Sequence, residues 1–216
     1  MSTRAMIGYM SPKDSVTGIY SHWDGYPDGV GYNLLKFYGN PKRVLHLIEG
    51  GDVSAIDWDT GHANHYAFRS TWVNWNSIDK KYDNEWDRGG LDEKWDDVKP
   101  RLYKSMEQYL DEALTGKSMI AYAYLFDYSG AEEFPDHSQL SKGRWRCFKS
   151  DYGSGKIFEV ELDEKKLKKA RGKSGKATKE KIIGVIPIRE VALCLKEFGR
   201  KITDLLEHLV MSHQKK

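Results

Sequence analysis

A run of nine residues, 118–126 (SMIAYAYLF), is the clearest strand signal in the sequence and sets the type of fold open to the chain. It is rich in the apolar and aromatic residues that pack well on a pleated sheet. Two later runs, 144–149 (RWRCFK) and 156–162 (KIFEVEL), have the composition of further strands. We therefore expect a sheet with these three strands in it.

The first residues of the chain add to this sheet. Residues 4–9 (RAMIGY) and 16–23 (VTGIYSHW) predict two short strands, and the residues between them are turn formers. GVIPI at 184–188 predicts a last strand, which Pro187 confines to an edge because proline cannot donate to a ladder.

Helices are predicted where apolar residues recur at three- and four-residue spacing. A first helix starts near Val30 and ends at Gly39. A second begins at Pro41, with Asn40 as its cap, and stops at Gly50.

A third and a fourth helix follow later in the chain. The third has Asp97 as its cap and Pro100 in its first turn, and Gly116 ends it. Its expected inner face consists of Leu102, Met106, Tyr109, Leu110 and Ala113. The fourth starts near Glu190, with an apolar stripe of Val191, Leu195, Phe198, Ile202, Leu205 and Leu209. Together the elements predict a single α+β domain over 1–216, in which a mostly antiparallel sheet is flanked by helices and a C-terminal amphipathic helix closes the chain.

Composition excludes several classes of protein. Of 216 residues 39% are hydrophobic, which is enough for a core and argues against whole-chain disorder. No apolar run reaches the length of about 18 residues that a membrane-spanning helix needs. The net charge of +2 argues against a DNA-coating protein, and the two cysteines form no CxxC pair. These features predict a cytoplasmic protein with no membrane contact.

The segment HWDGYP holds the first candidate site. On a strand, His22 and Asp24 would share one face, and a carboxylate can orient a histidine that acts as base or metal ligand. Tyr26 would be a hydrogen-bond donor in a hydrolase or small-ligand site. The alternative is that Asp24 and Gly25 form a turn and His22 holds it by a hydrogen bond. Ser2 is a further catalytic candidate, since an N-terminal serine can act as nucleophile with its own amine as base.

The second candidate site is a metal centre. Two carboxylates and two imidazoles, of Asp57, Asp59, His62 and His65, have residue types and spacing that can ligate zinc. The alternative is a solvated loop, because Gly61 lies among them. The sequence leaves any other cofactor unknown.

Residues 79–97 form an acidic segment with eight acidic and four basic residues, which we interpret as a solvated loop. Aromatic anchors among carboxylates suit contact with a protein partner that has a basic surface. The expected partner-binding residues are Asp79, Asp83, Glu85, Trp86, Asp87 and Trp95.

Residues 164–179 form a basic segment with eight basic residues and one acidic residue, predicted to be a flexible loop. Lysines at 165–179 can contact the phosphates of a nucleic acid, or close over those of a small ligand. The alternative is a solvated loop, since no aromatic residue is interleaved with the charges.

The N-terminal pattern resembles a group of small, uncharacterised bacteriophage and prophage proteins. The resemblance rests on the STR start, the Tyr-x-His-x-Asp-Gly-Tyr-Pro segment, the leucine-rich helix and the GDVSAI stretch, over residues 2–56, and more loosely on 118–149. It implies an accessory protein in the cytosol of a bacterial host that inhibits a host protein or defence complex, CRISPR systems included. A small-ligand-binding protein or hydrolase at HWDGYP, metal- or nucleotide-dependent, is the alternative. The sequence leaves the partner and the oligomeric state open.

Overall fold

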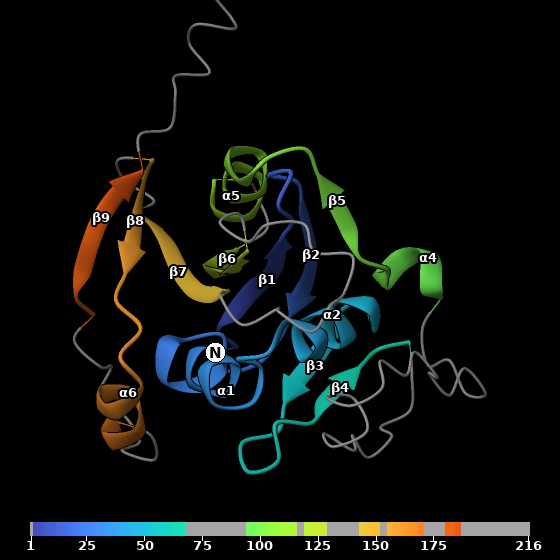
Figure 1. Cartoon of the computed structure of the whole chain (residues 1–216), viewed down its shortest axis with the longest axis horizontal. Coiled ribbons are helices and arrows are strands. Elements are labelled where there is room, and N and C mark those ends of the chain that lie inside the picture. Colours follow the sequence, from blue (N-terminus) through green and yellow to red (C-terminus); the bar gives the residue numbers. More distant parts are fainter. Residues whose placement is uncertain are drawn as a thin grey trace, which may run out of the picture. The chain divides into compact units, whose positions relative to one another are not determined.

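The computed structural model of the protein describes residues 2–67, 94–115, 119–128, 143–151, 155–170 and 180–186. Within them the chain forms a nine-stranded mixed sheet (Figure 1), most of whose pairs are antiparallel, in the order β4-β3-β2-β1-β6-β7-β8-β9, with β5 also paired to β2. The strands are β1 (Arg4–Met10), β2 (Val16–Ser21), β3 (Val53–Ile56), β4 (Ala63–His65), β5 (Arg101–Tyr103), β6 (Ile120–Asp127), β7 (Arg144–Asp151), β8 (Lys156–Val160) and β9 (Ile182–Ile186). The helices are the π-helix η1 (Pro27–Gly31), α1 (Tyr32–Phe37), α2 (Pro41–Glu49), α4 (Trp95–Val98), α5 (Met106–Leu114) and α6 (Glu164–Ala170). The α+β prediction is confirmed.

Strand β1 lies at the centre of the sheet. It pairs antiparallel with β2, with Ile7 opposite Ile19, and parallel with β6, with Ile7 opposite Tyr124. Because side chains alternate along a strand, each of these strands contributes to two cores, one on each face.

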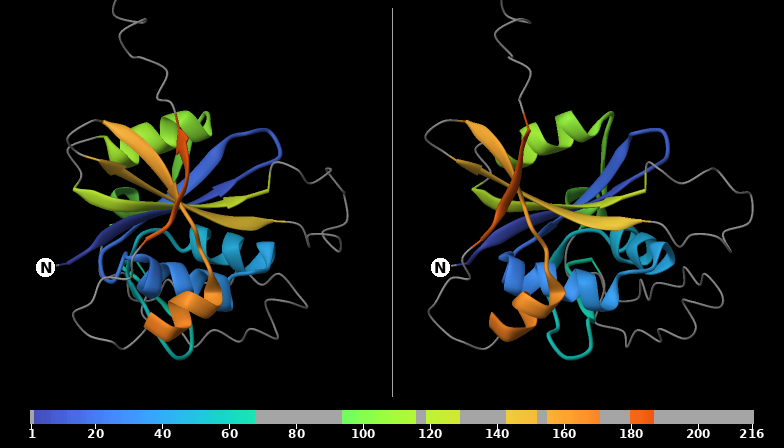
Figure 2. Two further views of the ribbon diagram at one scale, coloured as in Figure 1. Left: turned by 90° about the vertical axis from the view of Figure 1, so that its left-hand side faces the viewer. Right: turned by 60° about the vertical axis from the view of Figure 1, so that its left-hand side comes forward.

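The two faces are covered by different helices (Figure 2). Helices α1 and α2 cover the face of Ile7, Ile19 and Tyr124, where Leu34 and Leu47 are buried against the sheet residues in one apolar cluster. This face holds most of the large aromatic side chains of β6 and β7, including Phe126 and Trp145 in edge-to-face contact.

Helix α5 covers the opposite face. The ring of its buried Tyr109 lies over two glycines, so a Cβ on Gly8 or Gly18 would come within about 3.0 Å of the ring. The Tyr109 hydroxyl donates to the carbonyl oxygen of Tyr124. The glycines of β1 and β2 therefore make room for this one tyrosine.

The third helix starts later than the sequence predicts. Residues 95–98 form α4, and a short strand, β5, separates it from α5, whose cap is Ser105 rather than Asp97. Leu102 was predicted to lie on a buried helix face, but it lies in β5 and its side chain is 74% exposed. Proline 100 explains the break, since the residue before a proline is pushed to extended backbone.

The basic segment is also more ordered than predicted. Residues 164–170 form α6, which Leu167 anchors by its buried side chain, while residues 171–179 lie outside the described residues. The C-terminal amphipathic helix and nearly all of the acidic segment also lie outside them. No helix in the described part of the chain is long and apolar enough to cross a membrane.

The Asn40 cap, by contrast, is confirmed. Its side-chain oxygen accepts a hydrogen bond from the Lys42 backbone N–H at the start of α2. We expect Asn40→Ala to lower the free energy of unfolding by about 1 kcal/mol, because that N–H loses its acceptor. Urea unfolding measures the change, with Asn40→Asp, which keeps an acceptor, as the matched control. Equal losses in both variants would contradict the capping role.

Candidate functional site

Two of the sequence-predicted site residues, Ser2 and His22, lie at the end of β2. Beyond Ser21 the chain continues along β3, because the backbone N–H groups of His22 and Trp23 donate to the carbonyl oxygens of Val53 and Ser54 at 3.1 and 2.9 Å. The Ser2 hydroxyl donates to the carbonyl oxygen of His22. Ser2 thus joins the start of β1 to the end of β2, and the nucleophile role that the sequence suggested for it stays a prediction.

Tyr20, His22 and Trp23 form a row of rings here, the aromatic row. The side chains of Tyr20 and His22 share the face of Gly18, farther along the strand than the point where Tyr109 packs. The Tyr20 hydroxyl lies 2.7 Å from His22 Nδ1, and the imidazole meets the Trp23 ring edge to face, with centroids 4.8 Å apart. Trp23 is 49% exposed, so a large part of its ring is open to a ligand.

Arg4 places a positive charge beside the aromatic row. Its guanidinium interacts with the Tyr20 hydroxyl; burial raises the pKa of Tyr20, and Arg4 opposes that rise. No carboxylate in the described ranges pairs with Arg4. The arginine therefore keeps a net charge that can face an anion.

A second arginine nearby is neutralised. Arg101 of β5 makes a two-pronged ion pair with the buried carboxylate of Asp52, at 2.6 and 3.1 Å. The same carboxylate accepts the Tyr20 backbone N–H at 2.7 Å. The sequence analysis did not predict this pair. The signal that could have indicated it is the position of Asp52, an acidic residue between the end of a helix and an apolar strand.

Asp24 does not orient His22 as predicted. One oxygen of its carboxylate accepts the Tyr26 hydroxyl at 3.0 Å, and the other accepts the Trp58 indole N–H at 3.3 Å. Asp24 also has a φ of 56°, in the left-handed region. HWDGYP is therefore divided: His22 joins the aromatic row, whereas Asp24 and Tyr26 hold a turn against the β3–β4 hairpin.

The four predicted metal ligands lie on that hairpin but form no metal centre. Asp57 is exposed and accepts hydrogen bonds from the Thr60 side chain and backbone, which lower its pKa. Asp59 is exposed as well. Within the described ranges, no group of three or more His, Cys, Asp or Glu residues is placed to hold a metal ion.

His65 is instead part of the interior. Its Nδ1–H donates to the carbonyl oxygen of Gly51 at 2.9 Å, and its ring packs so tightly on Gly50 that a Cβ there would lie 2.4 Å from it. Burial, together with the nearby His46 and His62, lowers the pKa of His65 to about 3, although the hydrogen bond to Gly51 opposes the shift. Burial also lowers the pKa of His62, an effect that Asp57 opposes.

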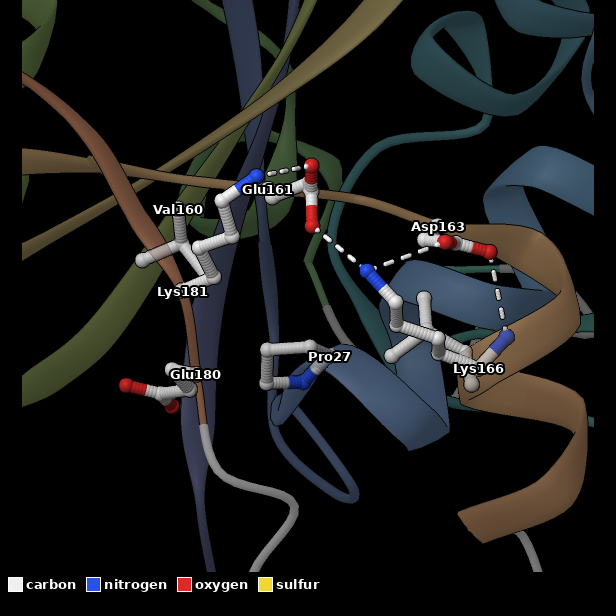
Figure 3. Close-up of a pocket in the computed structure, with 8 residues that line it drawn as sticks. Pro27, Val160, Glu161, Asp163, Lys166, Glu180 and Lys181 are labelled. Atoms are coloured by element: carbon white, nitrogen blue, oxygen red, sulfur yellow. Dashed lines mark hydrogen bonds and ion pairs between the residues drawn. The ribbon is translucent and has the colours of Figure 1, made fainter.

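A pocket of about 200 Å³ lies between η1, the end of β8, α6 and the two residues that precede β9 (Figure 3). Pro27 of HWDGYP and Lys166 of the basic segment both line it. This placement is what we expect if the basic segment closes over the phosphates of a small ligand. The lysines of the pocket are already paired, however: Lys166 and Lys181 each lie 2.9 Å from an oxygen of Glu161. Phosphates would have to compete with that carboxylate, so the pocket is a weaker candidate than the aromatic row.

Trp95 is the one described member of the predicted partner-binding set. It is the first residue of α4 and is half-buried in a small cluster with Tyr66, Ala67 and Val98. Asp79, Asp83, Glu85, Trp86 and Asp87 lie outside the described residues.

Substitutions of Asp24 distinguish the two interpretations of HWDGYP, a functional site and a structural turn. Asp24→Ala removes an acceptor for two donors and puts alanine at positive φ, so we expect a loss of about 2 kcal/mol in unfolding free energy. Asp24→Asn keeps an acceptor at a backbone conformation that asparagine tolerates, so we expect a smaller loss. Thermal unfolding gives the comparison, and an unchanged melting temperature in Asp24→Ala would refute the structural role.

Acid should destabilise the protein through His65. An unfolded histidine has a pKa of about 6.5, so below that pH the unfolded chain binds a proton that the folded chain excludes. Stability is complete above that pKa and falls as the pH drops toward 3; at pH 5 we expect a loss of about 2 kcal/mol from this residue.

Urea unfolding at pH 7.5 and pH 5.0 measures the slope. His65→Asn can keep a donor toward Gly51 but does not titrate, so its slope should be shallower. A slope identical to that of the native chain would show that other groups carry the acid sensitivity.

Comparison with known protein families, with curated proteins and with solved structures finds no match for this chain.

Proposed function

We propose that this chain is a binding protein, and that its ligand, a nucleotide-like molecule with a planar ring and a phosphate, binds at the end of β2. The observation that carries the proposal is a guanidinium without a carboxylate partner among the described residues, beside a row of three aromatic rings, one of them half exposed.

The chemistry of the row suits the two parts of such a ligand. A nucleobase has an apolar π-face that stacks on tryptophan, and one such contact contributes about 1–3 kcal/mol. The Arg4 guanidinium can form charge-assisted hydrogen bonds to phosphate oxygens. His22 offers its second ring nitrogen, since Nδ1 is engaged by the Tyr20 hydroxyl.

Support for the site also comes from its rigidity. Tyr20 and His22 are fixed through backbone hydrogen bonds to the Asp52 carboxylate and to β3. A ligand therefore meets rings that are already in position, which reduces the entropy lost on binding.

The inhibitor hypothesis stands apart from this site. An accessory protein of phage or prophage that blocks a host protein or defence complex remains a prediction from the resemblance and from the acidic segment, most of which lies outside the described residues. Reversing the charge of Asp79, Asp83, Glu85 and Asp87 and testing host-protein capture addresses it separately.

The nucleotide proposal is tested by calorimetry with the 5′-monophosphates of adenosine, guanosine, cytidine and uridine. We expect at least one to bind, and Trp23→Ala to raise its Kd about tenfold, because the stacking surface is lost. Arg4→Gln should remove the preference for the monophosphate over the free nucleoside.

Two controls separate binding from folding. Trp23→Phe keeps a ring and should bind nearly as well as the native chain, while Leu102→Ala changes an exposed apolar residue on β5 and should have no effect. No binding at millimolar nucleotide, or binding indifferent to both Trp23 and Arg4, would overturn the proposal.

A further inference from the structure

Strand β9 forms one end of the sheet, and its outer edge is unpaired among the residues that the structure describes (Figure 1). Three of its five residues are apolar and strongly exposed: Ile182 at 49%, Ile183 at 54% and Val185 at 55%. Edge strands of soluble proteins are usually protected by charges, proline or a covering element. Within its five residues, β9 has only β-branched residues and one glycine.

The glycine at the middle of β9 is not required by the fold of the described chain. A Cβ on Gly184 would meet only the Glu159 side chain, at 3.6 Å or more, which is ordinary contact, and its backbone is not in the left-handed region. Glycine weakens a strand interior, but it lets another backbone approach closely.

The sequence of β9 is symmetric about this glycine. It reads Ile-Ile-Gly-Val-Ile, so each residue has a β-branched apolar counterpart at the same distance on the other side. If two such strands pair antiparallel about Gly184, Ile183 lies opposite the partner's Val185, and Ile182 opposite the partner's Ile186. Each apolar side chain then has an apolar neighbour across the pair, which is the unit of sheet stabilisation.

We propose that β9 pairs antiparallel with β9 of a second copy of this chain, centred on Gly184, so that the two sheets become continuous. A self-complementary strand favours a second copy over an unrelated partner, because an isologous interface needs the same patch to fit itself. The pairing supplies both the backbone hydrogen bonds and the side-chain cover that β9 lacks in the described chain.

The dimer should be weak. A strand pair of five residues buries less than the roughly 800 Å² per partner found in stable complexes. We therefore expect the full-length chain to dissociate at micromolar concentrations, with a sedimentation coefficient that rises with protein concentration.

Charge substitutions test both the surface and the register. Ile183→Lys and Val185→Glu each place one charge against an apolar partner residue, so each should be monomeric across the concentration range at which the native chain associates. The double variant Ile183→Lys/Val185→Glu sets lysine opposite glutamate at both positions and should recover the dimer. Sedimentation velocity is the readout, and circular dichroism melting checks that each variant is folded.

Leu102→Lys is the matched control, since it charges an exposed apolar residue on β5 and should leave association unchanged. A native chain that stays monomeric up to millimolar concentration overturns the proposal. So does a dimer that survives both single substitutions, because another surface then holds it, and a double variant that stays monomeric overturns the register about Gly184.

Discussion

The buried carboxylate of Asp52 joins β2 to β5 beside the aromatic row. Its oxygens bind Arg101 of β5 and the backbone N–H of Tyr20 in β2, while its own N–H and carbonyl bond Val98 and Tyr66. A carboxylate in this position is stable only while its charge is balanced, since an unpaired buried charge is strongly unfavourable. Gly51 permits the arrangement: its φ is 77°, and a Cβ would lie 2.5 Å from the Val98 carbonyl oxygen. The Asp52 carboxylate holds the Tyr20 backbone, and with it the position of the aromatic row.

The HWDGYP segment contributes to two different parts of the structure. Up to Trp23 the chain follows β3, which fixes the rings on the sheet. At Asp24 the backbone turns through positive φ, and the next side chains belong to a turn instead. The Asp24 carboxylate accepts hydrogen bonds from Tyr26 and Trp58 instead of orienting the His22 ring. Asp24 and His22 are therefore close in sequence but are not hydrogen-bond partners.

The sequence predicted the elements with strong local signals. Strand β6 is apolar and aromatic over residues 120–126, and α2 has a cap, a proline and a double-glycine stop, so local chemistry determines both. The start of α5 was missed because Asp97 and Ser105 are both good caps, and the choice depends on the pairing of β5 with β2. The composition of the basic segment predicts a loop, because one apolar residue, Leu167, among many charges gives no helical pattern. At the site, the Tyr20–His22 contact follows from strand alternation, whereas Arg4 and Asp52 reach it from other strands, and no local pattern records that.

The parallel pairing of β1 with β6 determines the order in which strands of the sheet can pair during synthesis. Arg4 is opposite Ile120, so the two central strands are separated by more than half of the described chain. During synthesis, β1 and β2 can form their hairpin early, but one side of β1 stays open until β6 has left the ribosome. Contacts so distant in sequence also slow folding, because the entropy of closing the intervening chain is lost before the contact forms. The nascent protein therefore exposes the backbone edge of its most central strand for most of its synthesis.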